Sequence, residues 1–251
     1  MTTKIFIPAF VFLFVAFTLP EKKKIKVFIA GDSTAANKEI KAFPETGWGM
    51  PFSYFFDSTV TVDNRAKNGR STKTFITEGL WQKLIDDVQE NDYVFIQFGH
   101  NDEVKTKASY ATPEEYTANL TRFINETRDK KANPVLLTPV ARRKFDDAGK
   151  VVETHEEYSN IVREIAGKYK VPLIDHGEKS KQLLQQFGAE NSKWLYMQLD
   201  TLEHPNYPDG RNDNTHFNEF GARKMAEIVL AEIKNLKLEL ADRIIQPVVK
   251  K

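Results

Sequence analysis

Short apolar segments that favour β-strands alternate along this chain with longer amphipathic segments that favour helices. The expected strands are residues 24–30, 60–63, 93–98, 135–138 and 171–174. The expected helices are residues 71–88, 113–131, 153–170, 179–187 and 218–240. Strands that alternate with helices are joined by crossovers, which make the strands parallel and place helices on both faces of the sheet. The pattern therefore predicts an α/β protein, a three-layer α/β/α sandwich around a central parallel sheet.

Length, charge and cysteine content narrow the class of protein. The chain has 251 residues, with no internal repeat and no linker rich in Pro, Gly or Ser, so one folded domain is the simplest arrangement. Its formal net charge is +1, whereas nucleic-acid-binding proteins normally carry a strong basic excess, so no nucleic-acid partner is expected. The absence of cysteine excludes disulfides, thiol catalysis and a cysteine-anchored lipoprotein.

The N-terminal segment has the pattern of an export signal. Lys4 is the only charged residue before position 20, and the segment from Ile5 to Leu19 that follows it is almost entirely apolar. Such a segment is typical of a signal peptide and is short for a membrane span. We therefore expect residues 1–20 to be a signal peptide, residues 21–251 to form the domain, and the protein to be periplasmic or extracellular. The cleavage pattern Ala16-Phe17-Thr18 is poor, so an uncleaved membrane anchor is the alternative.

The first expected strand ends in a turn that carries a serine. The segment Lys24–Ala36 contains a mostly apolar strand followed by Gly31-Asp32-Ser33, and Asp, Ser and Thr favour turns and helix N-caps. In open α/β sheets the carboxyl ends of the strands form the crevice that binds ligands. Ser33 is therefore a candidate nucleophile, and a helix cap is the alternative.

Two later loops offer hydrogen-bond donors at the same edge of the expected sheet. Gly69 lies in a loop that leads into a helix, so its backbone N–H could point into the crevice at the positive end of that helix. Asn101 follows the third expected strand and carries a neutral amide donor, which suits an oxyanion hole. For both residues an ordinary turn position is the alternative.

Asp213 and His216 stand three positions apart, just before the last expected helix. A carboxylate at this spacing can accept the imidazole Nδ1–H and leave the other ring nitrogen free to act as a base. A surface ion pair and a pair of metal ligands are the alternatives. No proton transfer is assigned to the other histidines, which are His100, His155, His176 and His204.

Taken together, these loops resemble the four sequence blocks of the SGNH (GDSL-like) hydrolase superfamily. The blocks are Gly31-Asp32-Ser33, Asn64–Ser71 with Gly69, Gly99-His100-Asn101-Asp102, and Asp213–His216. Further segments resemble its rhamnogalacturonan acetylesterase branch, namely Trp48-Gly49, Asn64-Arg65-Ala66, Gly69-Arg70-Ser71, Pro205–Gly210 and Asp213–Phe217. The resemblance covers residues 26–235, and one departure is Asn68, where this branch commonly has a second glycine.

The resemblance implies a flavodoxin-like SGNH hydrolase fold and a serine esterase that uses no metal or organic cofactor. Ser33, Asp213 and His216 would be catalytic, and the backbone N–H groups of Ser33 and Gly69 with the Asn101 amide would form the oxyanion hole. The expected reaction is hydrolysis of acetyl esters on a pectic polysaccharide, rhamnogalacturonan in particular. The alternatives are an acetylesterase acting on xylan, a lipase or thioesterase acting on another acyl ester, and a non-catalytic carbohydrate-binding protein.

Aromatic and basic residues are candidates for substrate binding. Trp48, Trp194, Tyr196 and Tyr207 could stack on sugar rings of an acetylated polysaccharide or oligosaccharide, and core packing or loop anchoring is the alternative. Arg70 could bind a galacturonate carboxylate, since a guanidinium matches a carboxylate in shape. A solvated loop arginine is the alternative for Arg70.

Overall fold

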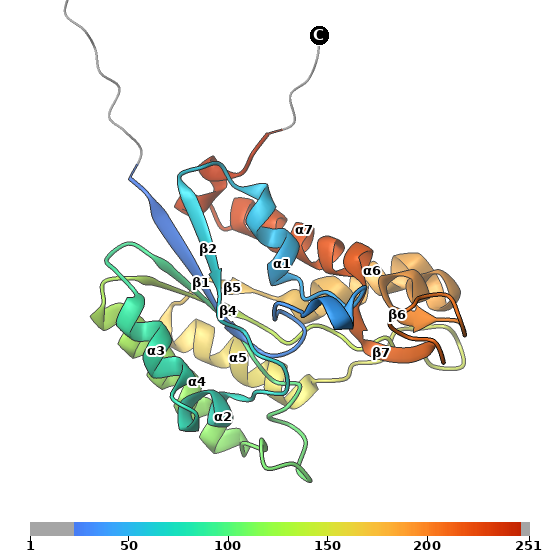
Figure 1. The fold of residues 1–251 in the computed structure, drawn as a ribbon. Coiled ribbons are helices and arrows are strands. Elements are labelled where there is room, and N and C mark those ends of the chain that lie inside the picture. Colours follow the sequence, from blue (N-terminus) through green and yellow to red (C-terminus); the bar gives the residue numbers. More distant parts are fainter. Residues whose placement is uncertain (1–22, 247–251) are drawn as a thin grey trace, which may run out of the picture.

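The computed structural model describes residues 23–246, and the expected signal peptide lies outside these residues. At its centre is a five-stranded sheet in which all neighbouring strands are parallel, in the order β2-β1-β3-β4-β5 (Figure 1). The strands are β1 (Ile25–Gly31), β2 (Val60–Asn64), β3 (Tyr93–Gln97), β4 (Asn133–Leu137) and β5 (Leu173–Ile174). This order is that of flavodoxin-like folds.

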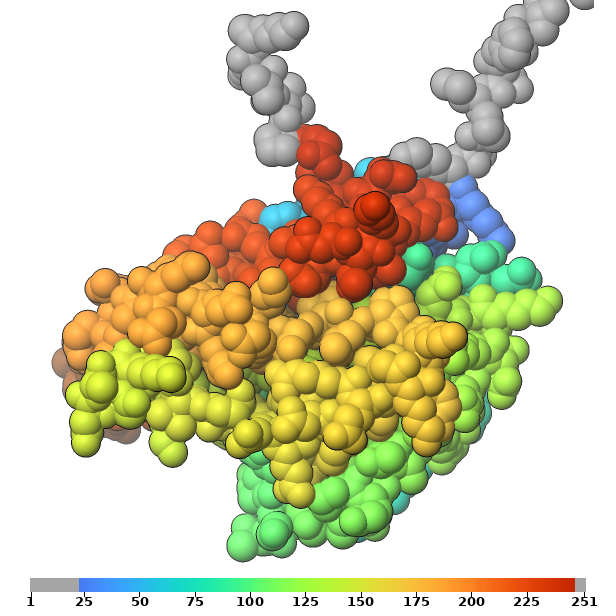
Figure 2. All heavy atoms as spheres, turned by 180° about the vertical axis from the view of Figure 1, so that it is seen from behind, coloured from blue at the N-terminus to red at the C-terminus, as the bar shows by residue number. Residues whose placement is uncertain are grey.

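Helices cover both faces of the sheet, which confirms the predicted three-layer architecture (Figure 1). On one face lie α2 (Thr72–Thr77), α3 (Leu80–Asp87), α4 (Pro113–Asp129) and α5 (Glu156–Tyr169). On the other face lie α1 (Gly49–Phe52), α6 (His176–Asn191) and α7 (Glu219–Asn235). Seen from behind, the C-terminal segment (red) lies above the segment of α5 (yellow) (Figure 2).

The middle strand β3 shows why an almost wholly apolar run forms a strand here. All of its residues are buried, because both faces of the sheet are covered. Successive side chains point to opposite faces. Val94 and Ile96 pack in the cluster that includes α3, α4 and α5, whereas Tyr93 and Phe95 pack in the cluster that includes α1 and α7.

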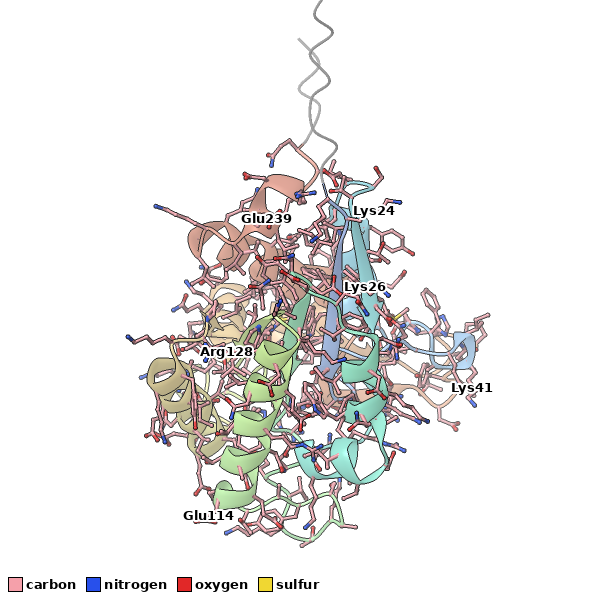
Figure 3. The ribbon with its side chains drawn as sticks, turned by 90° about the vertical axis from the view of Figure 1, so that its left-hand side faces the viewer. Lys24, Lys26, Lys41, Glu114, Arg128 and Glu239 are labelled. Carbon is pink, nitrogen blue, oxygen red and sulfur yellow. The ribbon has the colours of Figure 1, made fainter. Side chains whose placement is uncertain are left out.

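The start of α4 follows the sequence signals closely. The Thr112 hydroxyl accepts the Glu115 N–H (3.2 Å), and the Glu115 carboxylate accepts the Thr112 N–H (2.9 Å), which makes a reciprocal cap. Glu114 and Arg128 lie at opposite ends of this helix (Figure 3). This placement puts negative charge at the N-terminus and positive charge at the C-terminus, as the helix dipole favours.

Three predicted helices differ clearly in extent from the expectation, and one of them, α6, is longer at both ends than the expected 179–187. The segment 71–88 forms two helices, because Gly79 adopts a left-handed conformation (φ 69°) between α2 and α3. The last long helix ends at Asn235, and a separate 3₁₀ turn follows at Glu239–Arg243. Within residues 23–246, no helix combines the length and the apolar character needed to cross a membrane.

Residues 196–217, where no strand was expected, contain a two-stranded antiparallel hairpin. Its strands are β6 (Tyr196–Leu199) and β7 (Arg211–Phe217) (Figure 1). β7 has the sequence RNDNTHF, which lacks the apolar alternation that predicts a strand. His216 therefore lies within a strand and not in the loop that its position before α7 suggested.

Candidate active site

Ser33 follows β1 in a tight turn at the carboxyl edge of the sheet. The Asp32 carboxylate accepts the Thr34 N–H (2.9 Å) and the Thr34 hydroxyl (2.8 Å), and these bonds stabilise the turn. The turn lies where β1 is flanked by β2 on one side and β3 on the other, which is the switch point at which such sheets bind ligands. Asp32 is fully buried, whereas Ser33 stays partly exposed.

A continuous hydrogen-bonded relay joins Ser33 to His216 and Asp213. His216 Nε2 lies 2.9 Å from Ser33 Oγ, and Nδ1 of the same ring lies 2.8 Å from Asp213 Oδ2. The other Asp213 oxygen accepts the backbone N–H groups of Thr215 (2.8 Å) and His216 (3.0 Å). The relay brings together residues that are 183 positions apart in the chain.

The electrostatics of Asp213 suit its place in the relay. Burial alone would raise the pKa of this carboxyl, but the hydrogen bond and charge of His216 and the two backbone N–H groups hold it well below its ordinary range. An ionised carboxylate accepts the Nδ1–H of His216, which leaves Nε2 free to take the Ser33 proton. The Arg211 guanidinium also lies 3.0 Å from Asp213 Oδ2.

Gly69 lies on an exposed loop between β2 and α2. Its φ of +76° falls in the left-handed region, and a Cβ built there would meet nothing within 4 Å. Glycine is therefore favoured by conformation and not by lack of space. Within residues 23–246 the Gly69 N–H has no hydrogen-bond partner, so it is available to a bound oxygen atom.

Asn101 follows β3, and its amide holds the same loop. The side-chain nitrogen donates to the Arg70 carbonyl (3.0 Å), and Asn101 is only 8% exposed. One N–H of the amide thus positions the residue next to Gly69. The second N–H remains without a partner in the part of the chain that the structure describes. The site therefore offers a nucleophile, a base with its orienting acid, and two donors without partners.

Trp48 and Tyr196 are fully buried, so the prediction that they stack on sugar rings is wrong. The Trp48 indole donates to Gln97 Oε1 (2.6 Å) and packs edge-on against Phe52. The Tyr196 hydroxyl donates to the Ala141 carbonyl (2.9 Å). Each ring has its polar atom satisfied inside the core, which is how buried Trp and Tyr are normally accommodated.

The other predicted binding residues lie at the surface in different settings. Trp194 is 70% exposed and lines a surface cavity of about 880 Å³. Among the described residues, the lining of this cavity also includes Arg211 and Phe220 but not Ser33 or His216. Tyr207 donates its hydroxyl to the Ala42 carbonyl (2.8 Å) and so anchors a loop.

Arg70 is engaged within its own loop. Its guanidinium pairs with Glu78 (2.9 Å) and donates to the Asn68 carbonyl (2.9 Å). These bonds favour the alternative, a loop arginine, over a free guanidinium that would bind a substrate carboxylate. Its backbone carbonyl, which accepts from Asn101, is the part of Arg70 that contacts the site.

Two titratable residues for which the sequence predicted no proton transfer, His100 and Asp102, are buried next to the site. Burial and the neighbouring His155 lower the pKa of His100 to about 4, although Asp32, 3.5 Å away, acts in the opposite direction. Burial raises the pKa of Asp102 to about 7 in spite of hydrogen bonds from Thr72. Their position directly after a buried strand was the available signal.

No group of three or more potential metal ligands occurs within residues 23–246.

A relay of Asp, His and Ser at the carboxyl edge of a flavodoxin-like sheet defines a serine hydrolase of the α/β/α class. Residues 29–224 match the GDSL-like lipase/acylhydrolase family, and the chain belongs to this family. It is 41% identical over 225 residues to rhamnogalacturonan acetylesterase RhgT of Bacillus subtilis (strain 168), across 89% of this chain and 96% of that protein. It is 35% identical over 222 residues to the probable rhamnogalacturonan acetylesterase YesY of the same organism, across 88% and 97%.

Solved structures support the same fold. Protein YxiM of Bacillus subtilis superposes with a TM-score of 0.76 at 24% identity, across 87% of this chain and 58% of that chain. The acetylxylan esterase Axe2 of Geobacillus stearothermophilus superposes with a TM-score of 0.62 at 17% identity, across 84% and 94%. At such identities the likeness shows the fold alone.

Proposed function

We propose that this protein is a serine esterase that removes acetyl groups from a pectic polysaccharide, rhamnogalacturonan, through an acetyl-Ser33 intermediate. The chemistry rests on the relay in which His216 bridges Asp213 and Ser33 at 2.8 and 2.9 Å. The substrate rests on the 41% identity with rhamnogalacturonan acetylesterase RhgT across nearly the whole of both proteins.

In the first half of the reaction His216 Nε2 takes the Ser33 hydroxyl proton while Ser33 Oγ forms a bond to the acetyl carbonyl carbon. The carbonyl π electrons move to oxygen and give a tetrahedral oxyanion. When this intermediate collapses, the bond to the sugar oxygen breaks and the His216 proton passes to that oxygen. The deacetylated sugar leaves, and the acetyl group remains on Ser33.

In the second half water replaces the sugar. His216 takes a proton from the water, the resulting hydroxide attacks the acetyl carbon, and a second oxyanion forms. Its collapse breaks the bond to Ser33 Oγ, which regains the proton from His216, and acetic acid leaves and ionises to acetate in water. Asp213 stays ionised throughout and keeps the imidazole oriented.

Both oxyanions need donors that are in place before the reaction. The backbone N–H groups of Ser33 and Gly69 and the free N–H of the Asn101 amide fill this role. Removing one such donor typically costs about 3–4 kcal/mol in the barrier. The free donors on Gly69 and Asn101 are consistent with this role, since a donor already bonded inside the protein would not serve an oxyanion.

The test is acetate release from acetylated rhamnogalacturonan and acetylated xylan oligosaccharides, measured side by side with a Ser33→Ala control. We expect faster release from rhamnogalacturonan, with none above background in the control. Faster release from xylan would move the protein to the xylan alternative. Hydrolysis of long acyl chains at rates above those of acetate would move it to the lipase or thioesterase alternative, and no Ser33-dependent release from any ester would contradict an esterase.

We also propose that the protein is exported. The support is the sequence pattern of residues 1–20, with Lys4 before an apolar segment. Mass spectrometry of the mature N-terminus tests this proposal. A mature chain that starts near residue 20 is expected. An intact Met1 on protein recovered outside the cytoplasm would contradict cleavage and favour an uncleaved anchor.

A further inference from the structure

The ammonium group of Lys38 is buried beside the nucleophile turn. The Lys38 side chain is only 2% exposed. Its Nζ donates to the Ser33 carbonyl (2.7 Å) and to the Asn68 side-chain oxygen (2.8 Å), and it pairs with Glu45 (2.7 Å). An ammonium has three N–H donors, and here each has one acceptor.

Two of these acceptors belong to the two loops that carry the backbone donors of the oxyanion hole. Ser33 supplies one backbone N–H. Asn68 directly precedes Gly69, which supplies the other from a left-handed conformation (φ +76°). One ammonium therefore joins the nucleophile turn after β1 to the loop after β2, across a separation of 30 residues from Lys38 to Asn68.

Other bonds hold the neighbours of Asn68, and the Arg70 guanidinium donates to the Asn68 carbonyl (2.9 Å), so Lys38 supplies the bond that holds its side chain. The Asn101 amide holds the Arg70 carbonyl on the far side of Gly69 (3.0 Å). The Lys67 N–H donates to the Gly31 carbonyl (3.0 Å) on the near side. Asn68 itself is exposed, so apolar packing does not restrain it, and its contacts are hydrogen bonds.

Glu45 supplies the negative charge that pairs with the buried Lys38 ammonium. A buried ammonium without a counter-charge costs several kcal/mol, whereas a paired one with all donors satisfied does not. The Glu45 side chain is 14% exposed and lies 2.7 Å from Nζ. Glu45 thus compensates the charge of Lys38, and the short bonds from the Lys38 ammonium join Ser33 to Asn68.

We propose that Lys38 is a positioning residue that sets the spacing between the Ser33 and Gly69 N–H donors, so that both reach the same oxyanion. The proposal rests on the esterase function proposed above. Misplacement of such groups by about 1 Å can cost about 100-fold in rate. Loss of the bridge should therefore lower kcat and leave KM nearly unchanged, because the oxyanion exists in the transition state and not in the bound ester.

The test compares Lys38→Met, Asn68→Ala and the double variant with the wild-type full chain on 4-nitrophenyl acetate, which contains no sugar. Lys41→Met is the matched control, since Lys41 belongs to the same segment but points into solvent at the edge of the molecule (Figure 3) and pairs with Glu39 alone among the described residues. Ser33→Ala is measured alongside. Asn68→Ala guards against misfolding, because it removes the acceptor from an exposed position and leaves the Lys38–Glu45 pair intact.

We expect kcat to fall about 100-fold in Lys38→Met and about 10-fold in Asn68→Ala, with KM within about threefold of wild type. Methylboronic acid, whose adduct with serine places a negative oxygen in the oxyanion hole, should lose affinity by a similar factor. The double variant should be no worse than Lys38→Met, because both changes break one bridge. Lys41→Met should match wild type.

Two results would overturn the inference while the proposed function stands. One is kcat within twofold of wild type in both single variants while Ser33→Ala is inactive. The other is a fall in kcat with unchanged boronic acid affinity, which would show that the oxyanion hole keeps its geometry without the bridge. If Ser33→Ala itself keeps wild-type turnover, the esterase proposal fails instead.

Discussion

Ser33 follows an interior strand of a sheet that is covered on both faces, whereas His216 lies on a two-stranded hairpin beside that sheet. All residues of β1 except Lys26 are buried. In β7 only Phe217 is buried, and Arg211 and Asn212 are exposed. The nucleophile is therefore positioned by close-packed apolar side chains, and the base is positioned mainly by hydrogen bonds.

Polar bonds hold the exposed part of the hairpin, whereas its Tyr196–Phe217 end packs in the core. Arg143 donates to Asn214 Oδ1 (3.0 Å), and Gln198 Nε2 donates to the same oxygen (3.0 Å). Asn218 links the start of α7 to the Trp194 carbonyl (2.9 Å). Packed cores resist displacement more strongly than exposed hydrogen bonds do. We therefore expect changes on the sheet side to act on chemistry and global stability, and changes on the hairpin side to act on the placement of the base and the substrate.

Ser33→Ala should have the largest effect. Loss of the nucleophile is expected to lower kcat by about 10⁴-fold or more. The melting temperature should stay near that of wild type, because Ser33 is partly exposed. Steady-state hydrolysis of an acetyl ester and thermal unfolding measure the two effects. Retained turnover would remove Ser33 from the reaction.

Asn101→Ala tests the donor in the loop that follows the neighbouring strand β3. The amide offers one N–H to an oxyanion and uses the other to hold the Arg70 carbonyl, so kcat is expected to fall about 100-fold with little change in KM. Asn119→Ala is a control, since Asn119 donates to Thr72 on the same face without reaching the turn. Equal kcat in wild type and Asn101→Ala would exclude the amide from the oxyanion hole.

His176→Gln tests how a buried histidine on the sheet side makes the free energy of unfolding depend on pH. Burial lowers the pKa of His176 to about 3, whereas an unfolded imidazole titrates near 6.5. Between these values the unfolded chain binds a proton that the folded chain does not, so stability falls as pH falls through this window. From pH 7 to 4.5 this residue accounts for a loss of about 2–3 kcal/mol in the free energy of unfolding.

Gln at position 176 does not titrate, and its side-chain oxygen can accept the Gln97 Nε2–H bond that the His176 ring accepts at 2.9 Å. The variant should therefore lose about 2 kcal/mol less than wild type over the same pH range, as measured by urea unfolding. His100 and Asp102 titrate in both proteins, so their contributions cancel. His204→Gln, in a surface loop, should behave as wild type. If both proteins lost the same free energy of unfolding over this pH range, the pH dependence assigned to His176 would be wrong.

Arg143→Met tests the hairpin side. It removes the guanidinium bonds to Asn214 Oδ1, Ser192 (3.0 Å) and the Ala189 carbonyl, and it leaves the bond from the Arg143 backbone N–H to the Asn214 carbonyl (2.8 Å). We expect kcat to fall about 10-fold through displacement of β7 and His216, with about 2 kcal/mol lost in stability. Exposed Lys144→Met serves as control. Unchanged kcat together with lost stability would show that the hairpin does not depend on this anchor to place the base.

Trp194→Ala should give the smallest effect. If a ring stacked on a sugar contributes as much as an aromatic pair, about 0.5–1.5 kcal/mol, KM for the polysaccharide should rise about threefold to tenfold. KM for 4-nitrophenyl acetate should not change, because this small ester reacts at Ser33, which is not among the residues that line the cavity of Trp194. Phe220→Ala in the same cavity is the matched comparison. An equal rise in KM for both substrates would rule out a sugar contact.

The sequence by itself determined the parts of this protein that depend on local patterns. The strand and turn around Ser33, the glycine loop at Gly69 and the amide at Asn101 all follow from a strand-like run that ends in turn residues. Because parallel strands bring their carboxyl ends to one edge, these loops were expected to meet, and the fold places them there. The same local patterns located the start of α4 at Thr112-Pro113.

The tertiary structure decided whatever depends on partners far apart in the chain. Trp48 and Tyr196 carry no local mark that separates a core ring from a sugar-binding ring, and only packing of distant elements buries them. The strand β7 forms by pairing with β6 and not through an apolar alternation of its own. Lys38 resembles any surface lysine in sequence, and its contacts with Ser33, Glu45 and Asn68 exist because three loops converge on one ammonium. Local sequence fixes backbone preference, whereas burial and hydrogen-bond partners are set by the assembled fold.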